Sequence, residues 1–304
     1  MIFPDKLKKG DTIAIVATSS PVLKKQADLC KKLVEDMGYK VKMGKCTYLS
    51  IHGYSAGTGK EKAKDLNKMF EDKEVKAIWC IRGGDTSSHL MDKLNYEMIK
   101  ENPKIFVGYS DVTNLHVALN QKCDLVTFHG PMVKSNMLNN YDDFTRNSFE
   151  MALNMESELV LENPPGEDFQ VMIDGYAEGI ITGGNLSLLT SMIGTNYEVD
   201  TKGKILFIED VNESVTRVDR MMYQLKYSGK LDDVAGIIIG DFTNCNNENC
   251  KEYRVEELMK DVLSNYNKPV MYNIKSGHCY PMSTIPFGLK CILDTNTKQI
   301  KFKK

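Results

Sequence analysis

The sequence predicts an α/β protein of two domains. Short apolar runs alternate with segments of helical periodicity through the first half of the chain, which is typical of a parallel sheet covered by helices. The alternation is less regular in the second half, which ends in two β-type runs suited to a hairpin and so indicates mixed strand directions. We therefore expect a parallel-sheet domain over residues 1–150, a linker over residues 151–174 and a mixed α/β domain over residues 175–304.

The expected elements of the first domain follow one another with few interruptions. A strand at residues 12–16 precedes a helix over residues 22–37, which stops before Gly38, a common helix terminator. The elements expected after it are strand 39–43, helix 60–70, strand 75–81, helix 86–94, strand 104–109, helix 111–120 and strand 125–128.

The second domain is expected after a stretch rich in proline and acidic residues at residues 163–168, which we interpret as part of the linker. Its expected elements are helix 186–193, strand 204–208, helix 215–227, strand 235–239, helix 255–263, strand 269–274 and a hairpin of residues 289–293 and 299–302.

Composition excludes several classes of function. The 304 residues are 42% hydrophobic, enough for two cores, and a formal charge of -2 gives no basic footprint for nucleic acid. No apolar run approaches the ~20 residues of a membrane helix, and the first residues do not resemble a signal peptide. We expect a cytoplasmic protein that engages neither a membrane nor nucleic acid.

The eight cysteines are scattered along the chain, as reduced thiols of a cytosolic protein commonly are. Cys245 and Cys250 have a spacing within the range of zinc ligands, but no second Cys or His pair flanks them. We therefore expect no metal site and no cofactor.

Ser110 is the most informative single residue. It lies between the apolar run 104–109 and the helix 111–120, so it stands on a tight strand-to-helix turn. Such a turn exposes the hydroxyl, Gly108 permits the close turn, and the Asp111 amide lies at a helix N-terminus. Serine after a strand also commonly caps a helix, so the spacing alone leaves both interpretations open.

Two further residues favour the nucleophile. Glu209 ends a buried strand, where a carboxylate is costly without a partner or a task, and His278 follows the strand at residues 269–274. The carboxyl ends of strands are where open α/β sheets build their sites. We expect Ser110 as nucleophile, His278 as general base and Glu209 as the acid that orients the histidine. Cys279 is an alternative nucleophile, but no such turn presents it.

Glycines and polar residues near these strand ends suggest how a substrate is held. The Asp111 amide and Gly84, in the Gly83-Gly84 turn, are candidate oxyanion donors. Arg82 fits either a peptide's terminal carboxylate or a structural ion pair. Gly83 is a candidate substrate contact. Asn185, which follows Gly183-Gly184, either shapes the binding cleft or caps the helix 186–193.

Four other polar residues have weaker functional interpretations. His116 lies six residues after Ser110, an offset that turns it away from the nucleophile's face of the helix, so we expect it either on the helix surface or packed inside. His129 ends a strand and is a candidate cleft-lining residue. Arg217 and Arg220 share a helix face and indicate domain or dimer contacts.

Several short motifs together resemble the LD-carboxypeptidase family, in order and spacing, from about residue 10 to residue 302. The motifs are Ile81-Arg82-Gly83-Gly84, Gly108-Tyr109-Ser110-Asp111-Val112-Thr113, His129-Gly130-Pro131-Met132, Gly183-Gly184-Asn185-Leu186-Ser187, Ile208-Glu209-Asp210, Arg217-Val218-Asp219-Arg220 and Gly277-His278. The resemblance implies a flavodoxin- or Rossmann-like first domain, a swivelling-type second domain, a Ser110-Glu209-His278 serine peptidase and a homodimer. Asp85-Thr86 depart from the tyrosine and glycine that many members carry there, which leaves the local substrate contacts open.

Three functions remain at this point. The first is removal of the terminal D-alanine from a muropeptide tetrapeptide during peptidoglycan recycling. The second is an immunity-type hydrolase that cuts an amide between an aminoacyl group and a nucleotide-like moiety, and the third is a non-catalytic two-lobed binding module. We favour the first, because the loop at residues 194–197 is short and the single tryptophan, Trp79, lies in an expected strand.

Overall fold

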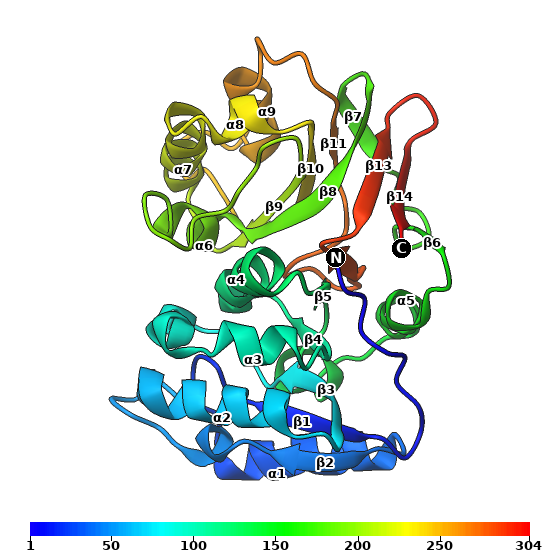
Figure 1. Ribbon diagram of the computed structural model, residues 1–304. Coiled ribbons are helices and arrows are strands. Elements are labelled where there is room, and N and C mark those ends of the chain that lie inside the picture. Colours follow the sequence, from blue (N-terminus) through cyan, green and yellow to red (C-terminus); the bar gives the residue numbers. More distant parts are fainter.

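Two β-sheets with their flanking helices form two lobes, stacked one above the other in Figure 1. The structure is a computed structural model that describes residues 1–304. The first sheet and its helices make up the N-terminal lobe, and the second sheet and its helices make up the C-terminal lobe. The two chain termini lie close together at the junction, where the Lys304 ammonium stands 3.7 Å from the centre of the Phe3 ring.

The first sheet has the strand order β12-β5-β4-β3-β1-β2. Its elements are β1 Thr12–Val16, α1 Lys24–Asp36, β2 Lys40–Met43, α2 Gly59–Glu71, β3 Val75–Cys80, α3 Tyr96–Lys100, β4 Ile105–Gly108, α4 Thr113–Cys123, β5 Thr127–His129 and α5 Asp143–Asn154. Shorter helical turns, η1 Lys45–Tyr48, η2 Ser87–Lys93, η3 Ser110–Val112 and η4 Val133–Met137, connect them. The β2-β1-β3-β4-β5 order is flavodoxin-like and confirms that prediction.

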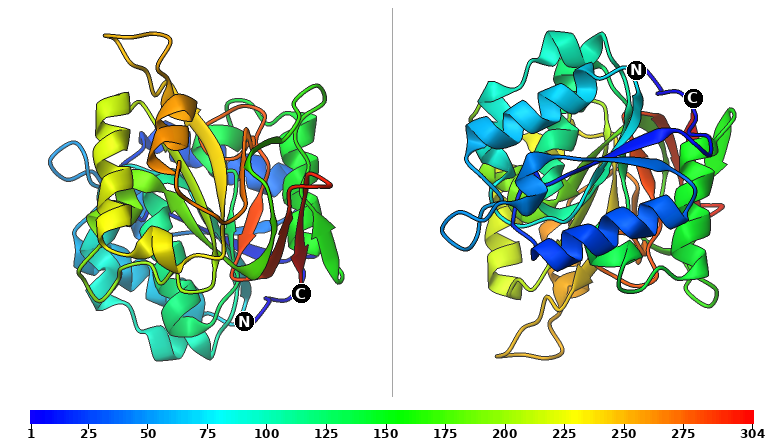
Figure 2. Two further views of the ribbon diagram at one scale, coloured as in Figure 1. Left: turned by 90° about the horizontal axis from the view of Figure 1, so that it is seen from above. Right: turned by 90° about the horizontal axis from the view of Figure 1, so that it is seen from below.

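Alternation along β1 explains the layers of this lobe. Ile13 and Ile15 pack with α1 and α5, whereas Ala14 and Val16 pack with α2 and α4. All four side chains are buried, so the strand reads as a continuous apolar run with a helix layer on each side. Figure 2 shows α1 and α2 on opposite sides of the sheet.

The first sheet is not entirely parallel, and here the prediction was incomplete. Strand β12, Ile285–Phe287, comes from near the end of the chain and pairs antiparallel with β5. The chain therefore returns to the N-terminal lobe after building most of the C-terminal one. A three-residue strand that contains Pro286 carries almost no periodic signal, which is why the sequence did not indicate it.

The second sheet is mixed, as expected, with the order β6-β14-β13-β8-β9-β10-β11-β7. Its elements are β6 Glu158–Val160, β7 Gln170–Ile173, β8 Tyr176–Asn185, α6 Leu186–Ser191, β9 Ile205–Val211, α7 Val215–Tyr227, α8 Lys230–Asp233, β10 Gly236–Thr243, α9 Val255–Val262, β11 Val270–Tyr272, β13 Lys290–Asp294 and β14 Gln299–Lys303. The expected hairpin is β13 and β14. Residues 151–174, which we expected to be a linker, instead supply the two edge strands β6 and β7.

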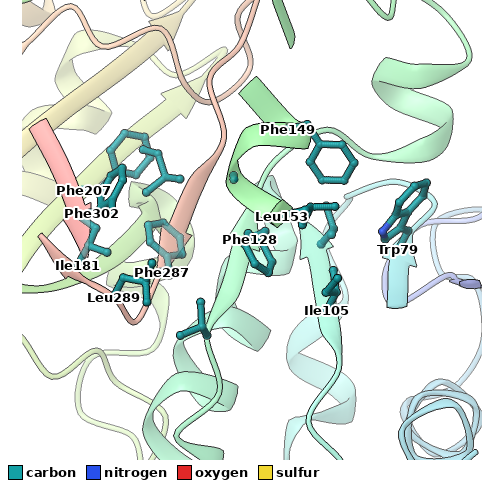
Figure 3. Packing of buried hydrophobic residues seen from close by; sticks show 14 of the residues in the cluster. Trp79, Ile105, Phe128, Phe149, Leu153, Ile181, Phe207, Phe287, Leu289 and Phe302 are labelled. Atoms are coloured by element: carbon teal, nitrogen blue, oxygen red, sulfur yellow. The ribbon is translucent and has the colours of Figure 1, made fainter. Parts of the chain in front are cut away.

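One hydrophobic core crosses the junction between the lobes. Figure 3 shows Trp79, Phe128 and Phe149 of the first lobe in the same cluster as Phe207 and Phe287. Phe287 sits on β12, and its ring centre lies 6.1 Å from that of Phe207 on β9. The side chains of β12 therefore tie the two sheets together by burial, which stabilises their relative placement.

Candidate active site

Ser110 stands on a strained turn between β4 and α4. Its backbone φ is +64°, a left-handed conformation that a non-glycine residue adopts only at a cost. The amide of Val112 donates to the Tyr109 carbonyl and that of Thr113 donates to the Ser110 carbonyl, so the helical turn begins at once. This geometry is that of a nucleophile elbow, in which the serine hydroxyl is presented at the carboxyl end of the sheet.

Gly83 packs directly against the serine side chain. A Cβ atom at Gly83 would lie 3.0 Å from both Cβ and Oγ of Ser110 and 3.6 Å from the Asp111 amide nitrogen. Any larger residue would crowd the hydroxyl, so glycine is required here by close approach. The Gly83-Gly84 turn and the Asp111 amide thus flank Ser110, the arrangement that an oxyanion hole needs.

Glu209 and His278 form a buried acid–base pair in the C-terminal lobe. His278 Nδ1 lies 2.8 Å from Glu209 Oε2, and the carboxylate is fully buried at the end of β9. Gly277 allows this approach, since a Cβ atom there would lie 2.6 Å from the same carboxylate oxygen. Burial alone lowers the pKa of His278, but the charge and hydrogen bond of Glu209 outweigh it and raise the pKa above its ordinary value.

Tyr109 connects this pair to the nucleophile turn. Its ring packs edge-on against the His278 ring with the centres 4.9 Å apart, and Tyr109 immediately precedes Ser110. The structure therefore brings residues from β4, from the end of β9 and from the loop after β11 to one place at the junction of the lobes. Sequence reasoning had not given Tyr109 this role, because an aromatic residue at the end of a strand is ordinarily read as core.

Asp210, the neighbour of Glu209 on β9, is hydrogen-bonded to residues at the start of α6. Asn185 caps α6 by accepting from the Leu188 amide, and its side-chain amide donates to Asp210 at 2.9 Å. Asp210 also accepts from the amide and the hydroxyl of Ser187. The structure thus shows the capping interpretation of Asn185, with both ends of its amide engaged inside the protein.

Arg82 is partly exposed beside the nucleophile turn. Its guanidinium makes no ion pair, and Nη1 donates to the Pro21 carbonyl at 3.3 Å. The structural ion pair considered for Arg82 is therefore not formed. The positive charge next to Gly83 remains available to an anionic group.

The other candidate residues do not join this site. His116 is fully buried and its Nε2 lies 2.8 Å from the Gly108 carbonyl oxygen. His129 is fully buried too, its ring nitrogens have no hydrogen-bond partner, and it does not line an open cleft as expected. Burial raises the pKa of the Cys279 thiol, which disfavours the thiolate that a nucleophile requires.

The structure contains neither a cluster of metal ligands nor a membrane-spanning helix. Cys245 is buried and Cys250 is exposed, and no group of three or more His, Cys, Asp or Glu side chains is placed to hold a metal ion. Among the helices, none combines the length and the apolar character that a membrane crossing requires.

Comparisons with known proteins agree with this geometry. Residues 13–130 match the LD-carboxypeptidase N-terminal domain and residues 178–293 match the LD-carboxypeptidase C-terminal domain. A probable murein peptide carboxypeptidase of Bacillus subtilis is 40% identical over 297 residues, covering 97% of this chain and 92% of that protein.

Solved structures extend the likeness to three dimensions. The muramoyltetrapeptide carboxypeptidase of Oxalobacter formigenes superposes with a TM-score of 0.82 at 28% identity, covering 96% of this chain and 97% of the other. Microcin C7 self-immunity protein MccF, in complex with aspartyl sulfamoyl adenosine, gives a TM-score of 0.92 at 28% identity, covering 100% and 99%. With both domains matched and a relative 40% identical over nearly its whole length, this chain belongs to the LD-carboxypeptidase family of serine peptidases.

Proposed function

We propose that this protein is a serine-type LD-carboxypeptidase that removes the terminal D-alanine from muropeptide tetrapeptides in peptidoglycan recycling. The observation that carries the proposal is the left-handed Ser110 turn beside the 2.8 Å Glu209–His278 pair. The 40% identical murein peptide carboxypeptidase supports the substrate class. A binding module without catalysis would have no use for a strained serine and a buried carboxylate, both of which cost stability.

The proposed reaction uses the three residues in sequence. Because Nδ1 of His278 faces Glu209, Nε2 is the nitrogen left to take the proton from the Ser110 hydroxyl. The Ser110 oxygen then bonds to the carbonyl carbon of the scissile amide, and the histidinium returns its proton to the amine of the departing D-alanine. Water repeats the two steps on the acyl-enzyme, which releases the shortened peptide and restores Ser110.

Two groups near Ser110 fit the charges that this reaction places on the substrate. The Asp111 amide and the Gly83-Gly84 turn lie next to the Ser110 side chain, and we assign them to the developing oxyanion. Arg82, with no internal ion pair, suits the free carboxylate of the terminal residue. A charged terminal carboxylate is what distinguishes a carboxypeptidase substrate from an internal peptide bond.

The same proposal places the enzyme in the cytoplasm as a homodimer. All eight cysteines are free, which suits a reducing compartment. Arg217 and Arg220 are exposed on α7, where Arg217 pairs with Glu213 and Arg220 donates to the Thr216 carbonyl, both within the C-terminal lobe. A second copy is the further partner that we infer for them. Light scattering on the purified protein distinguishes the dimer from a monomer.

Hydrolysis of an aminoacyl-nucleotide amide is the second candidate, because MccF has been solved with aspartyl sulfamoyl adenosine. Trp79, the single tryptophan of this chain, is only 2% exposed and packs against Phe149. It therefore offers no indole face to a nucleobase. The lack of an exposed indole favours a muropeptide as the substrate.

Incubation with a synthetic tetrapeptide ending in D-alanine, followed by mass spectrometry, tests the proposal. We expect release of D-alanine from the free acid, and little cleavage of the same peptide amidated at its C-terminus, since amidation leaves Arg82 without a partner. Equal cleavage of both forms would argue against a carboxypeptidase. Cleavage of aspartyl sulfamoyl adenosine with the tetrapeptide untouched would establish the second candidate instead.

A further inference from the structure

The side chain of Asp111, next to the nucleophile, is engaged in a buried network that the reaction itself does not use. The carboxylate is only 1% exposed. It accepts from the amide of Thr86 at 3.0 Å, from the amide of Ser87 at 2.8 Å and from the Ser87 hydroxyl at 2.8 Å. The Ser19 hydroxyl also donates to it. A carboxylate with this many donors is satisfied without any contact to solvent.

These donors belong to the segment that immediately follows the Gly83-Gly84 turn. Gly84 itself has φ +147° and lies so close to the loop after β1 that a Cβ atom would come within 2.0 Å of the Ser20 hydroxyl. The Ser20 amide donates to the Gly83 carbonyl at 3.4 Å. The turn is thus fixed on one side by the loop after β1 and on the other by Asp111.

A buried lysine completes the network. Lys62 on α2 is 1% exposed, and its ammonium donates to the carbonyl and to the hydroxyl of Thr86, both at 2.7 Å. It has no carboxylate partner at ion-pair distance. Burial lowers the pKa of Lys62 to about 8, and the negative charge of Asp111 opposes that shift. Thr86 therefore lies between a buried cation and a buried anion, and it is held by hydrogen bonds from both directions.

We propose that the Asp111 side chain is a positioning residue that fixes the distance between the two oxyanion donors, with Lys62 as its buried counter-charge. One donor is the Asp111 amide and the other is in the Gly83-Gly84 turn, and the carboxylate ties these two turns directly to each other. The inference rests on the proposed function. Asp85-Thr86 stand where many members of the family carry tyrosine and glycine, and the inference gives Thr86 a role at that position. Thr86 is buried in the network, whereas Asp85 is exposed.

An isosteric change tests the inference against a purely structural role. The amides of Thr86 and Ser87 both donate to Oδ2 of Asp111. In Asp111→Asn the side-chain oxygen can still accept from them, but the negative charge that strengthens these hydrogen bonds and faces Lys62 is lost, so the two turns are held less firmly. The control is Asp65→Asn, because Asp65 is also a buried carboxylate of this lobe that accepts from a backbone amide, that of Cys46 at 2.7 Å, without touching the nucleophile turn.

The primary measurement is the rate at which a small fluorophosphonate labels Ser110, which requires the oxyanion hole but no peptide recognition. We expect labelling on the order of 10²-fold slower in Asp111→Asn and unchanged in Asp65→Asn, at comparable thermal stability. Labelling of Asp111→Asn at the wild-type rate would overturn the inference, and so would a wild-type protein that does not label. A labelled protein that releases no D-alanine would contradict only the proposed substrate.

Two further measurements separate positioning from folding. In the D-alanine assay, Asp111→Asn should lower kcat with little change in KM, since the oxyanion forms only in the transition state. Lys62→Met keeps the carboxylate and removes its counter-charge, so it should slow labelling by about tenfold even if Asp111→Asn fails to fold. If a folded Lys62→Met protein labels at the wild-type rate, Lys62 has no part in the proposal. If, in addition, Asp111→Asn does not fold, the whole proposal is overturned.

Discussion

The nucleophile turn and the acid–base pair are built in opposite ways. Ser110 owes its position to its own strand and helix: β4 leads into it, α4 leaves it, and strain at a single residue turns the chain. Glu209 and His278 are 69 residues apart, and β10 lies between β9 and β11 in the sheet. They meet only because the loop after β11 passes the end of β10, where the Asp241 amide donates to the Ser276 carbonyl, and brings Gly277 against Glu209. The position of the proposed nucleophile can therefore be encoded locally, whereas that of its proposed base depends on the assembly of the second sheet and on its docking against the first.

The contact between the two regions passes through aromatic side chains. Tyr109 packs on His278, and behind it His129 packs with Phe207 and Phe287. Because Phe287 lies on a strand that the C-terminal part of the chain contributes to the first sheet, the docking is part of the hydrophobic core. Burial of apolar surface holds the two regions together, but it does not fix their relative orientation. The directional hydrogen bonds of the short β12 pairing align them.

The largest expected effect comes from changing Ser110, the residue whose position is encoded locally. Ser110→Ala removes the attacking oxygen and should reduce D-alanine release by ~10⁴-fold or more with the fold retained. Cys279→Ala is the matched control, since a half-buried thiol of raised pKa contributes no nucleophile and its loss should leave the rate within about threefold. A fully active Ser110→Ala protein would move the nucleophile to another residue.

The activity that depends on the Glu209–His278 pair should respond to removal of the Glu209 charge. Glu209→Gln keeps the shape of the side chain but removes the charge that raises the pKa of His278, so that pKa falls. Since His278 acts in its neutral form, the acidic limb of the kcat/KM profile should move to lower pH while the maximum drops by roughly 10³-fold.

Asp241→Asn is the control for this profile. Asp241 also raises the pKa of His278, but only through its charge and without a hydrogen bond to the ring. The acidic limb should shift in the same direction by less, with little loss of the maximum. An acidic limb that does not move in Glu209→Gln would separate the pair from catalysis.

Docking of the lobes is tested by stability. Phe287→Ala removes a fully buried ring from the shared core and should lower the free energy of unfolding by about 3–5 kcal/mol. Trp79 fluorescence reports the N-terminal lobe, and we expect it to lose stability together with the far-UV circular dichroism signal. Phe70→Ala, equally buried but within the N-terminal lobe alone, is the matched control. An unchanged Trp79 transition in Phe287→Ala would show that the lobes do not share a core.

A smaller effect is expected from the histidines buried between the two regions. Burial lowers the pKa of His116 to about 4 and that of His129 below its ordinary value. Both bind a proton more readily in the unfolded chain, so the free energy of unfolding should be greatest above about pH 6.5 and fall as the pH drops toward 4.

Replacing one of these histidines tests the assignment. His129→Leu loses no hydrogen bond, since the ring nitrogens have no partner, and it should reduce the slope of that fall by up to ~1.4 kcal/mol per pH unit. Phe128→Leu, at an equally buried position that cannot bind a proton, should leave the slope unchanged. Identical slopes in His129→Leu and the wild type would show that His129 does not cause the acid sensitivity.

The same contrast between local and assembled structure explains which strands could be predicted from the sequence. Strands such as β1 and β3, apolar on both faces and followed by helices, were predictable, and so was the Ser110 turn at the end of β4. Strands β6, β7, β8 and β12 were not. Strand β8 has ten residues, but its three glycines interrupt the apolar pattern. Strands β6, β7 and β12 each have only three or four residues and pair with a strand distant in the chain. Their positions follow from tertiary packing, which leaves no period in the sequence.

The site residues divide along the same line. Ser110, Glu209 and His278 could be proposed because each has an unusual residue type at a strand end. The Tyr109 contact with His278 and the Asp111 contacts with residues 86–87 could not, since an aromatic residue and an acidic residue near a helix start are ordinary in local sequence. A signal existed only in the combination of Asp111 with the Gly83-Gly84 turn, and the fold alone brings these together.

The central claim is that Ser110 on the first sheet and His278 on the second act as one catalytic unit. A double-mutant cycle of Ser110→Ala and His278→Ala, assayed by D-alanine release, tests it most directly. Residues that act as a unit are non-additive, so the double variant should retain the same residual rate as either single variant. Two single losses that instead multiply in the double variant would contradict the account, because Ser110 and His278 would then contribute independently.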